Sequence, residues 1–170
     1  MQLVKPSTKY QESYLAAFEE GKPETNHTSL TSPRENQSFA EFVREEIDHE
    51  KGKSLPKDWV SETVLWLIDT NEFIGRVSIR HRLTETLRAT GGHIGYWIRP
   101  SKRKLGYGKI ILKLALSTAK KLKIHHVLVT CDETNIGSRK IIEANDGVLE
   151  NSIMSENEGS LKRRYWITLK

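Results

Sequence analysis

The most informative segment of the chain reads Ile98-Arg99-Pro100-Ser101-Lys102-Arg103-Lys104-Leu105-Gly106-Tyr107-Gly108. The first amides of a helix have no partner within it and lie at the positive end of its dipole, which suits a diphosphate. Glycine at positions 106 and 108 permits the backbone angles and the close approach that a phosphate-binding loop needs. Four cations add positive charge around these glycines: Lys102, Arg103, Lys104 and Lys109.

The segments on either side of this loop have different periodicities. Residues 93–98 are apolar and β-branched or aromatic in large part, and Pro100 ends the strand that they predict. From Gly106 to Leu122, apolar residues recur at helical spacing while lysines occupy the remaining faces. The two glycines alone are equally compatible with an ordinary turn, so the prediction depends on this order of strand, loop and helix.

The rest of the chain predicts further helices and strands in a mixed order. A helix capped by Ser38, with Glu41 completing a capping box, has the clearest start signal. The expected elements are a terminal strand, helices over 10–18 and 39–47, strands over 59–69, 73–83 and 93–98, the long helix, a strand over 126–131, a helix capped by Asn135, and strands over 148–154 and 162–169. This order is typical of a mixed α/β domain.

The composition is that of one soluble domain over residues 1–170, with 36% hydrophobic and 29% charged residues. No apolar run approaches the roughly 20 residues of a membrane helix, and residues 1–7 lack a secretory apolar region, so we expect a cytoplasmic protein without a membrane partner. The lone Cys131 agrees with that compartment. The net charge of +5 does not gather in a stripe or a reading helix, which argues against a nucleic-acid partner.

The segment 98–108 resembles the acetyl-CoA signature of the Gcn5-related N-acetyltransferase (GNAT) family. The segment Asn135-Ile136-Gly137-Ser138-Arg139-Lys140-Ile141-Ile142 is similar to the second region with which that family contacts its cofactor. The two regions lie within 92–147, about a third of the chain. The resemblance implies a single-domain α/β fold, in which a mixed, mostly antiparallel sheet is splayed at the acetyl-CoA site and flanked by helices.

The resemblance also implies which residues hold the cofactor. The amides from Arg103 to Lys109 would bind the pyrophosphate, and backbone groups of Tyr96 and Ile98 would pair with the pantetheine arm as if it were an added strand. Asn135 would reach the cofactor near that arm, with Ser138 close by. Helix capping is the competing interpretation for both: Asn135 can cap the helix in either case, and capping accounts for Ser138 equally well. The full expected set is Tyr96, Trp97, Ile98, Arg103, Lys104, Leu105, Gly106, Tyr107, Gly108, Lys109, Asn135 and Ser138. Acetyl-CoA is the implied cosubstrate, and no metal is expected.

The expected catalytic groups are less clear, because the chain departs from the family pattern. Ile142 stands where many relatives carry a tyrosine proton donor, and Gly92 and Ile94 stand where relatives carry a Glu or His base. His93 lies between those two positions and titrates in the useful range, so it is the candidate general base. Simple alternation places its side chain on the opposite face of the strand, where a structural role is the competing interpretation.

The leading functional hypothesis is transfer of an acetyl group from acetyl-CoA to a primary amine of a small molecule, amino acid or peptide by direct attack. One alternative keeps the fold and makes the acceptor a protein N-terminus or lysine. Another is a non-catalytic acyl-CoA-binding sensor, which would release no free thiol from acetyl-CoA. The polar stretches 22–36 and 82–90 are expected to cover the acceptor side. Both a monomer and a homodimer are compatible with the sequence.

Overall fold

A computed structural model describes residues 1–22, 30–53, 55, 57–155 and 159–170. Part of the polar connection expected over 22–36 lies outside the described residues, as does most of the closing turn. The elements in chain order are β1 (Gln2–Val4), α1 (Gln11–Gly21), α2 (Phe39–Asp48), β2 (Glu62–Asp69), β3 (Glu72–Arg80), β4 (Ile94–Ile98), α3 (Tyr107–Lys121), β5 (His126–Asp132), α4 (Ile136–Glu143), β6 (Val148–Met154) and β7 (Leu161–Thr168). Short helical turns η1 (Thr8–Tyr10), η3 (His49–Lys51), η4 (Leu87–Gly91) and η5 (Pro100–Lys102) connect them. The expected mixed α/β order is confirmed.

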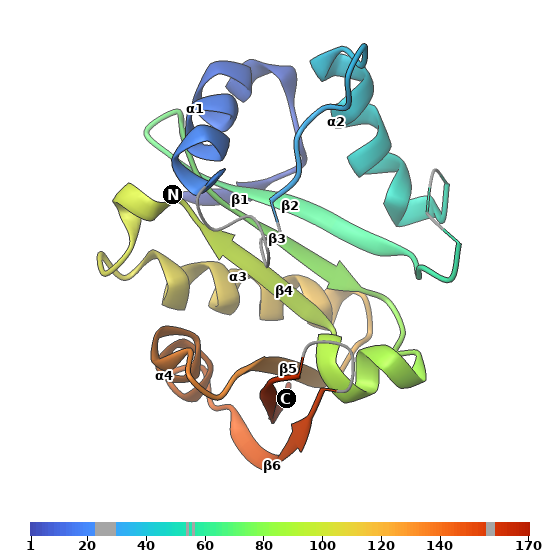
Figure 1. Ribbon diagram of the computed structural model, residues 1–170, viewed down its shortest axis with the longest axis vertical. Coiled ribbons are helices and arrows are strands. Elements are labelled where there is room, and N and C mark those ends of the chain that lie inside the picture. Colours follow the sequence, from blue (N-terminus) through green and yellow to red (C-terminus); the bar gives the residue numbers. More distant parts are fainter. Residues whose placement is uncertain (23–29, 54, 56, 156–158) are drawn as a thin grey trace.

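The strands form two antiparallel sheets that meet at β4 and β5 (Figure 1). The larger sheet has the order β1-β2-β3-β4, and the smaller has the order β5-β7-β6. Helices α1 and α2 lie on one side of the larger sheet and α3 lies on the other, while α4 lies beside the smaller sheet (Figure 1). The expected sheet with a splay between its two halves is therefore present.

Two hydrophobic clusters hold these layers together. The cluster between the sheets and α3 includes Leu67, Val77 and Ile111, each 0% exposed. The cluster beneath α1 and α2 is aromatic: Tyr14 stacks on Trp66 with ring centroids 4.5 Å apart. Burying an aromatic or aliphatic side chain of this size stabilises the fold by about 1.5–3 kcal/mol relative to leaving it in water.

The local start signals of the helices are confirmed. Ser38 accepts a hydrogen bond from the backbone N–H of Glu41, whose carboxylate accepts one from the N–H of Ser38 in return. Asn135 caps α4 with a single hydrogen bond, in which its side-chain oxygen accepts from the N–H of Ser138 at 2.9 Å. Helix α3 covers 107–121, in agreement with its apolar periodicity.

Two elements differ from the sequence prediction. The strand expected from Trp59 begins at Glu62, which pairs with Arg80, the last residue of β3; Ser61 adds one further hydrogen bond, from the N–H of His81 at 2.9 Å, where the ladder ends. The strand expected over 73–83 ends at Arg80, and the polar stretch that follows it runs into the helical turn η4. Tertiary hydrogen bonds fix this turn: the Arg80 guanidinium donates to the carbonyls of Gly91 and Gly92.

Candidate functional site

The loop before α3 has the geometry of an anion-binding loop. Lys104 and Gly106 have positive φ values of 62° and 89°, which turn the chain sharply before the helix begins. Within the described residues, the backbone amides of 104–108 donate no hydrogen bond to another backbone group, whereas the amide of Lys109 donates to the carbonyl of Gly106 at 3.1 Å. The loop therefore offers several free N–H donors at the positive end of a 15-residue helix.

The two glycines of this loop serve different purposes. A Cβ added at Gly106 would meet nothing within 4 Å, so the positive φ alone favours glycine there. A Cβ added at Gly108 would lie 2.4 Å from Cδ1 of Ile141, so this glycine lets α3 and α4 pack closely. The sequence prediction assigned both glycines to the ligand, and the packing of α4 is an additional reason for the second.

The cations around the loop do not all face the same way. The ammonium of Lys102 pairs with Glu72 at 2.6 Å, so its charge is compensated within the protein. The Nε of Arg103 donates to the carbonyl of Ile98 at 3.0 Å. Lys104 and Lys109 are exposed beside the free amides. The latter two are therefore the cations best placed to meet a phosphate by long-range attraction.

Three expected contact residues turn their side chains elsewhere. Tyr107 donates its hydroxyl hydrogen to Asp69 at 2.8 Å, which ties the start of α3 to the end of β2. Trp97 is 6% exposed and belongs to the aromatic cluster beneath α1 and α2. Leu105 is 65% exposed. Tyr107 can therefore contribute its backbone N–H and Leu105 its backbone N–H and an apolar surface, whereas Trp97 pairs with Arg76 of β3 and serves the packing of the fold.

Strand β4 presents an unpaired backbone edge toward the opening between the sheets. Hydrogen bonds at both ends of the β3–β4 ladder fix its pattern: the N–H of Arg80 donates to the carbonyl of His93, and the N–H of Arg99 donates to the carbonyl of Ile74. Hydrogen-bonding direction alternates along an antiparallel strand, so Tyr96 and Ile98 point their backbone groups away from β3. An extended ligand could therefore add to this edge.

His93 joins the two sheets at the closed end of that opening. Its N–H donates to the carbonyl of Leu128 at 2.7 Å, and its Nδ1 accepts from the N–H of Leu128 at 2.9 Å. Burial, together with the positive charges of Arg88 and Arg80, lowers the pKa of His93 to about 4. The imidazole is therefore neutral at physiological pH, with its proton on Nε2 and its accepting nitrogen already occupied.

A pair of hydroxyl groups spans β4 and α4. The hydroxyl of Tyr96 lies 2.7 Å from Oγ of Ser138, and burial raises the pKa of Tyr96. Cys131, at the end of β5, is buried, and this burial raises the pKa of its thiol to about 11. These groups are neutral at physiological pH, so Tyr96 and Ser138 can donate a proton or a hydrogen bond.

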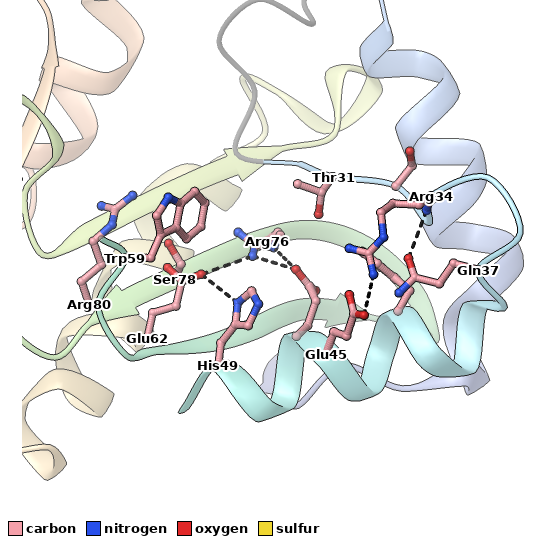
Figure 2. Close-up of a pocket in the computed structure, with 13 residues that line it drawn as sticks. Thr31, Arg34, Gln37, Glu45, His49, Trp59, Glu62, Arg76, Ser78 and Arg80 are labelled. Atoms are coloured by element: carbon pink, nitrogen blue, oxygen red, sulfur yellow. Dashed lines mark hydrogen bonds and ion pairs between the residues drawn. The ribbon is translucent and has the colours of Figure 1, made fainter. Parts of the chain in front are cut away.

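A pocket of about 470 Å³ lies on the other side of the larger sheet, beneath α2 (Figure 2). Strands β2 and β3 form its floor, and Trp59, 57% exposed, stands at its edge. Its lining is rich in charge and consists of Thr31, Ser32, Arg34, Gln37, Phe42, Glu45, Glu46, His49, Trp59, Glu62, Arg76, Ser78 and Arg80. A pocket of this size accommodates a small molecule or a short peptide end.

Buried ion pairs organise the floor of the pocket (Figure 2). Arg76 donates to Oε1 of Glu46 from Nε at 2.8 Å and from Nη2 at 2.7 Å, and Trp66 donates to the other oxygen of Glu46 at 3.1 Å. Nδ1 of His49 lies 3.3 Å from Oε1 of Glu62. His49, Arg76 and Arg80 lower the pKa of the Glu62 carboxyl against the opposing effect of burial, so Glu62 is ionised.

Sequence reasoning did not identify this pocket. The signal available was the polar face of β3, where Arg76, Ser78 and Arg80 alternate with apolar residues in a strand that is otherwise buried. Their partner Glu46 comes from α2, and the residues between them in sequence give no sign of the contact. A buried strand face of this polarity indicates a site, because isolated charges in a core are costly.

Two further features bear on the class of chemistry. In the described part of the chain, no group of three or more His, Cys, Asp or Glu side chains could hold a metal ion. None of the helices within the described ranges has the length and apolar character needed to cross a membrane.

Comparison with known proteins identifies the family of the chain and solved structures with a similar fold. A family model described as acetyltransferase (GNAT) domain matches residues 8–148. Comparison with curated protein sequences finds no match. Among solved structures, the chain is similar to the acetyltransferase from Salmonella typhimurium that modifies the N-terminal serine of 50S ribosomal subunit protein L7/L12, with 16% identity and a TM-score of 0.70 over 99% of this chain and 94% of that one.

Two other solved structures have the same architecture. The microcin C7 self-immunity acetyltransferase, in complex with acetyl-CoA and AMP, is 15% identical with a TM-score of 0.68, over 98% of this chain and 91% of that one. A GNAT-family acetyltransferase from Bacillus anthracis is 18% identical with a TM-score of 0.66, over 98% and 93% of the two chains. At these identities, the likeness to the solved structures shows the fold alone.

Proposed function

The chain belongs to the GNAT acetyltransferase family, and on that premise we propose that residues 1–170 act as one domain that transfers an acetyl group from acetyl-CoA to a primary amine. The acceptor is a small molecule, an amino acid or a peptide. The observation that carries the proposal is the row of free amides at 104–108 beside the unpaired edge of β4. The loop before α3 would hold the diphosphate of the cofactor, and the edge of β4 would pair with its extended pantetheine arm.

The residues present fit acetyl-CoA. The amides of 104–108, with Lys104 and Lys109 nearby, would bind the pyrophosphate. The backbone of Tyr96 and Ile98 would pair with the pantetheine arm, although the carbonyl of Ile98 already accepts from Arg103. Asn135 would contribute through the start of α4. When bound, acetyl-CoA supplies an activated acetyl group as a thioester.

The hydroxyl pair of Tyr96 and Ser138 is our proposed source of the proton for the departing thiolate. It spans β4 and α4 next to the strand edge on which the arm would lie, and both hydroxyls retain their protons at physiological pH. Proton transfer from a positioned hydroxyl contributes about 10²- to 10⁴-fold to such a reaction. Ser138 would thus act in the role that the family pattern assigns to a tyrosine at position 142.

His93 is less suited to the role of general base than the sequence suggested. To accept a proton, Nδ1 would have to give up the hydrogen bond from the Leu128 amide, and burial next to two arginines opposes the positive charge. We propose that His93 positions β4 against β5, and that the amine loses its proton to water in the pocket beneath α2.

The pocket beneath α2 is our proposed acceptor site. It ends at Ser78 and Arg80 on β3, and Ser78 is paired with Gly95 on β4. Residues directly opposite in an antiparallel ladder point to the same face, so Gly95 presents no side chain between the pocket and the edge of β4. An amine bound in the pocket would therefore approach the thioester over Gly95, where β4 carries no side chain.

Free-thiol release from acetyl-CoA, measured with a panel of amines, tests the proposal. Release that depends on both the protein and an amine, with the acetylated amine identified by mass spectrometry, is the expected outcome. Binding of acetyl-CoA without release for any amine would instead support a non-catalytic sensor. No binding at all would refute the cofactor assignment.

A protein N-terminus is the second candidate acceptor, favoured by the similarity to the acetyltransferase that modifies an N-terminal serine. Peptides that begin with serine or alanine, assayed beside the corresponding free amino acids, separate the two. A protein N-terminal acetyltransferase would prefer the peptides, and an enzyme for small molecules would prefer the free compounds.

A further inference from the structure

The pocket cations differ in how their charge is compensated. Arg34 pairs with Glu45 at 2.5 Å, and Arg76 pairs with Glu46 at 2.7 Å. Arg80 has only neutral partners: its Nη1 donates to the carbonyls of Gly91 at 2.9 Å and Gly92 at 3.2 Å. Among the residues that the structure describes, Arg80 makes no ion pair within 4 Å.

The free part of the Arg80 guanidinium has the shape of a carboxylate receptor. Nη1 is held by two carbonyls, and within the described ranges the edge formed by Nε and Nη2 has no protein partner. Two parallel N–H groups on such an edge match the two oxygens of a carboxylate, which gives short, charge-assisted hydrogen bonds. Because the carbonyls already fix the guanidinium, little side-chain entropy remains to be lost on binding.

The electrostatic surroundings favour an arriving anion. Burial lowers the pKa of Arg80, which means that its positive charge is poorly solvated. Glu62, directly opposite Arg80 in the β2–β3 register, offsets only part of this effect, because its carboxylate lies against His49 and 3.9 Å from Nη2 of Arg76. An anion on the free edge would complete the neutralisation of Arg80.

Arg80 also lies at the end of the pocket nearest to the edge of β4. Its N–H donates to His93 O at 2.8 Å, so the two strands are adjacent at this residue, with the usual separation of about 4.8 Å. Figure 2 shows Arg80 at the same end of the pocket as Trp59, whose exposed ring offers a surface for an apolar side chain. If the amino group of an acceptor approaches over Gly95, an anionic group only a few bonds from that amine would lie next to Arg80.

We propose that Arg80 is a specificity residue that binds the carboxylate of the acceptor, so that the acceptor is an amino acid with an apolar side chain. This inference rests on the proposed acetyl transfer and narrows its substrate class. Carboxylate binding by Arg80 and packing against Trp59 together would orient the amino group toward β4.

Three matched compounds test the proposal on the wild-type protein: L-phenylalanine, L-phenylalaninamide and 2-phenylethylamine, with the leucine series as a second set. The amide has the more acidic ammonium and therefore more free amine, so intrinsic reactivity favours the amide. We expect kcat/KM for the amino acids to exceed that for the amides and amines by about 10- to 100-fold, as loss of a charge-assisted bidentate contact implies.

Arg80→Gln should abolish that preference, mainly by raising KM for the amino acids, and should change kcat/KM for the amides by less than about threefold. Arg80→Lys, which keeps the charge but loses the fork, should retain part of the preference. Arg82→Gln, two residues further along and exposed, removes the same charge outside the pocket and should leave the preference intact. An unchanged affinity for coenzyme A shows that each variant is folded.

The outcomes separate this inference from the proposed function. Equal or better acetylation of the amides and amines by the wild-type protein overturns the role of Arg80 but leaves acetyl transfer in place. Acetylation of peptides alone has the same meaning. Failure of every amine to release thiol from acetyl-CoA refutes the proposed function itself. If Arg80→Gln does not fold, the wild-type comparison still decides.

Discussion

Replacing Gly106 with alanine tests whether the loop before α3 binds the pyrophosphate. Gly106 has φ 89° and ψ −11°, and a Cβ at this position meets nothing within 4 Å, so alanine adds backbone strain and no steric clash. An L-residue in this left-handed region costs about 1–2 kcal/mol. In the free variant the exposed loop can relax, because only the amides of Lys109 and Ile110 hold the carbonyl of Gly106.

Binding would then have to restore the strained conformation, which should raise the Kd for coenzyme A by about 5- to 30-fold. Isothermal titration calorimetry measures that change, and urea denaturation measures stability in parallel. Gly159→Ala is a matched control, since Gly159 also has a positive φ of 60° with nothing near its Cβ, but it lies in the turn before β7. It should alter stability without altering Kd.

A Gly106→Ala variant that binds coenzyme A within twofold of the wild type would refute the reasoning. Such a result, combined with a loss of stability like that of Gly159→Ala, would mean that the positive φ serves only the start of α3.

Three further predictions concern buried groups. Glu46→Ala should leave the buried Arg76 with only its longer, 3.9 Å contact to Glu62, and should lower the free energy of unfolding by about 3–5 kcal/mol, seen as a fall in Tm of about 6–20 °C. Glu46→Ala combined with Arg76→Met should largely reverse this loss. The pKa of His93 is about 4 in the folded chain and near 6.5 in the unfolded chain, so the unfolded state binds more protons between these two pH values. The free energy of unfolding should therefore fall as the pH drops from about 6.5 to about 4, and His93→Asn should flatten that part of the plot of unfolding free energy against pH. A plot that the substitution leaves unchanged would contradict a buried neutral imidazole. With a thiol pKa of about 11, Cys131 is a thiolate in only about one molecule in a thousand at pH 8. The folded protein should therefore react with Ellman's reagent far more slowly than the urea-unfolded protein. Equal rates would show that the thiol is accessible in the folded protein.

The parts of the fold that sequence reasoning recovered depend on local signals. The period of α3 is visible because its buried residues, such as Ile111 and Ala115, recur one turn apart. The start of α2 is visible because Ser38 and Glu41 satisfy one another's backbone amides without help from the rest of the chain. Each of these interactions is complete within a few residues, so the sequence contains all of it.

The parts that sequence reasoning missed depend on contacts between distant segments. The turn η4 has no apolar periodicity, and its conformation is fixed by Arg80 and by Thr130, which donates to the carbonyl of Thr90 at 2.6 Å. The orientation of His93 depends on Leu128, 35 residues away. The pocket beneath α2 requires Glu46 and Arg76 to meet across two elements. None of these partners can be paired from composition or spacing.

The candidate site likewise has a part that can be predicted from local sequence and a part that depends on contacts between distant segments. The loop over 103–109 and the cap at Asn135 are continuous segments whose chemistry is visible in their residues. In the structure α4 packs against the start of α3, where Ile141 lies beside Gly108. The charged floor of the pocket is discontinuous in sequence. Its members attract attention only once strand alternation places Arg76 and Arg80 on a buried face.

The opening between β4 and β5 also has a thermodynamic consequence. A continuous sheet would satisfy both main-chain groups of Tyr96 and the N–H of Ile98 with a neighbouring strand, whereas here water must do so until a ligand arrives. The carbonyl of Ile98 already accepts a hydrogen bond from Arg103. A ligand lying along that edge would pair with β4 as an added strand, and the free energy of unfolding would then depend on the ligand concentration. Amide hydrogens at these two positions should therefore exchange with deuterium fastest when coenzyme A is scarce, which makes the protein's lifetime a function of its cosubstrate supply.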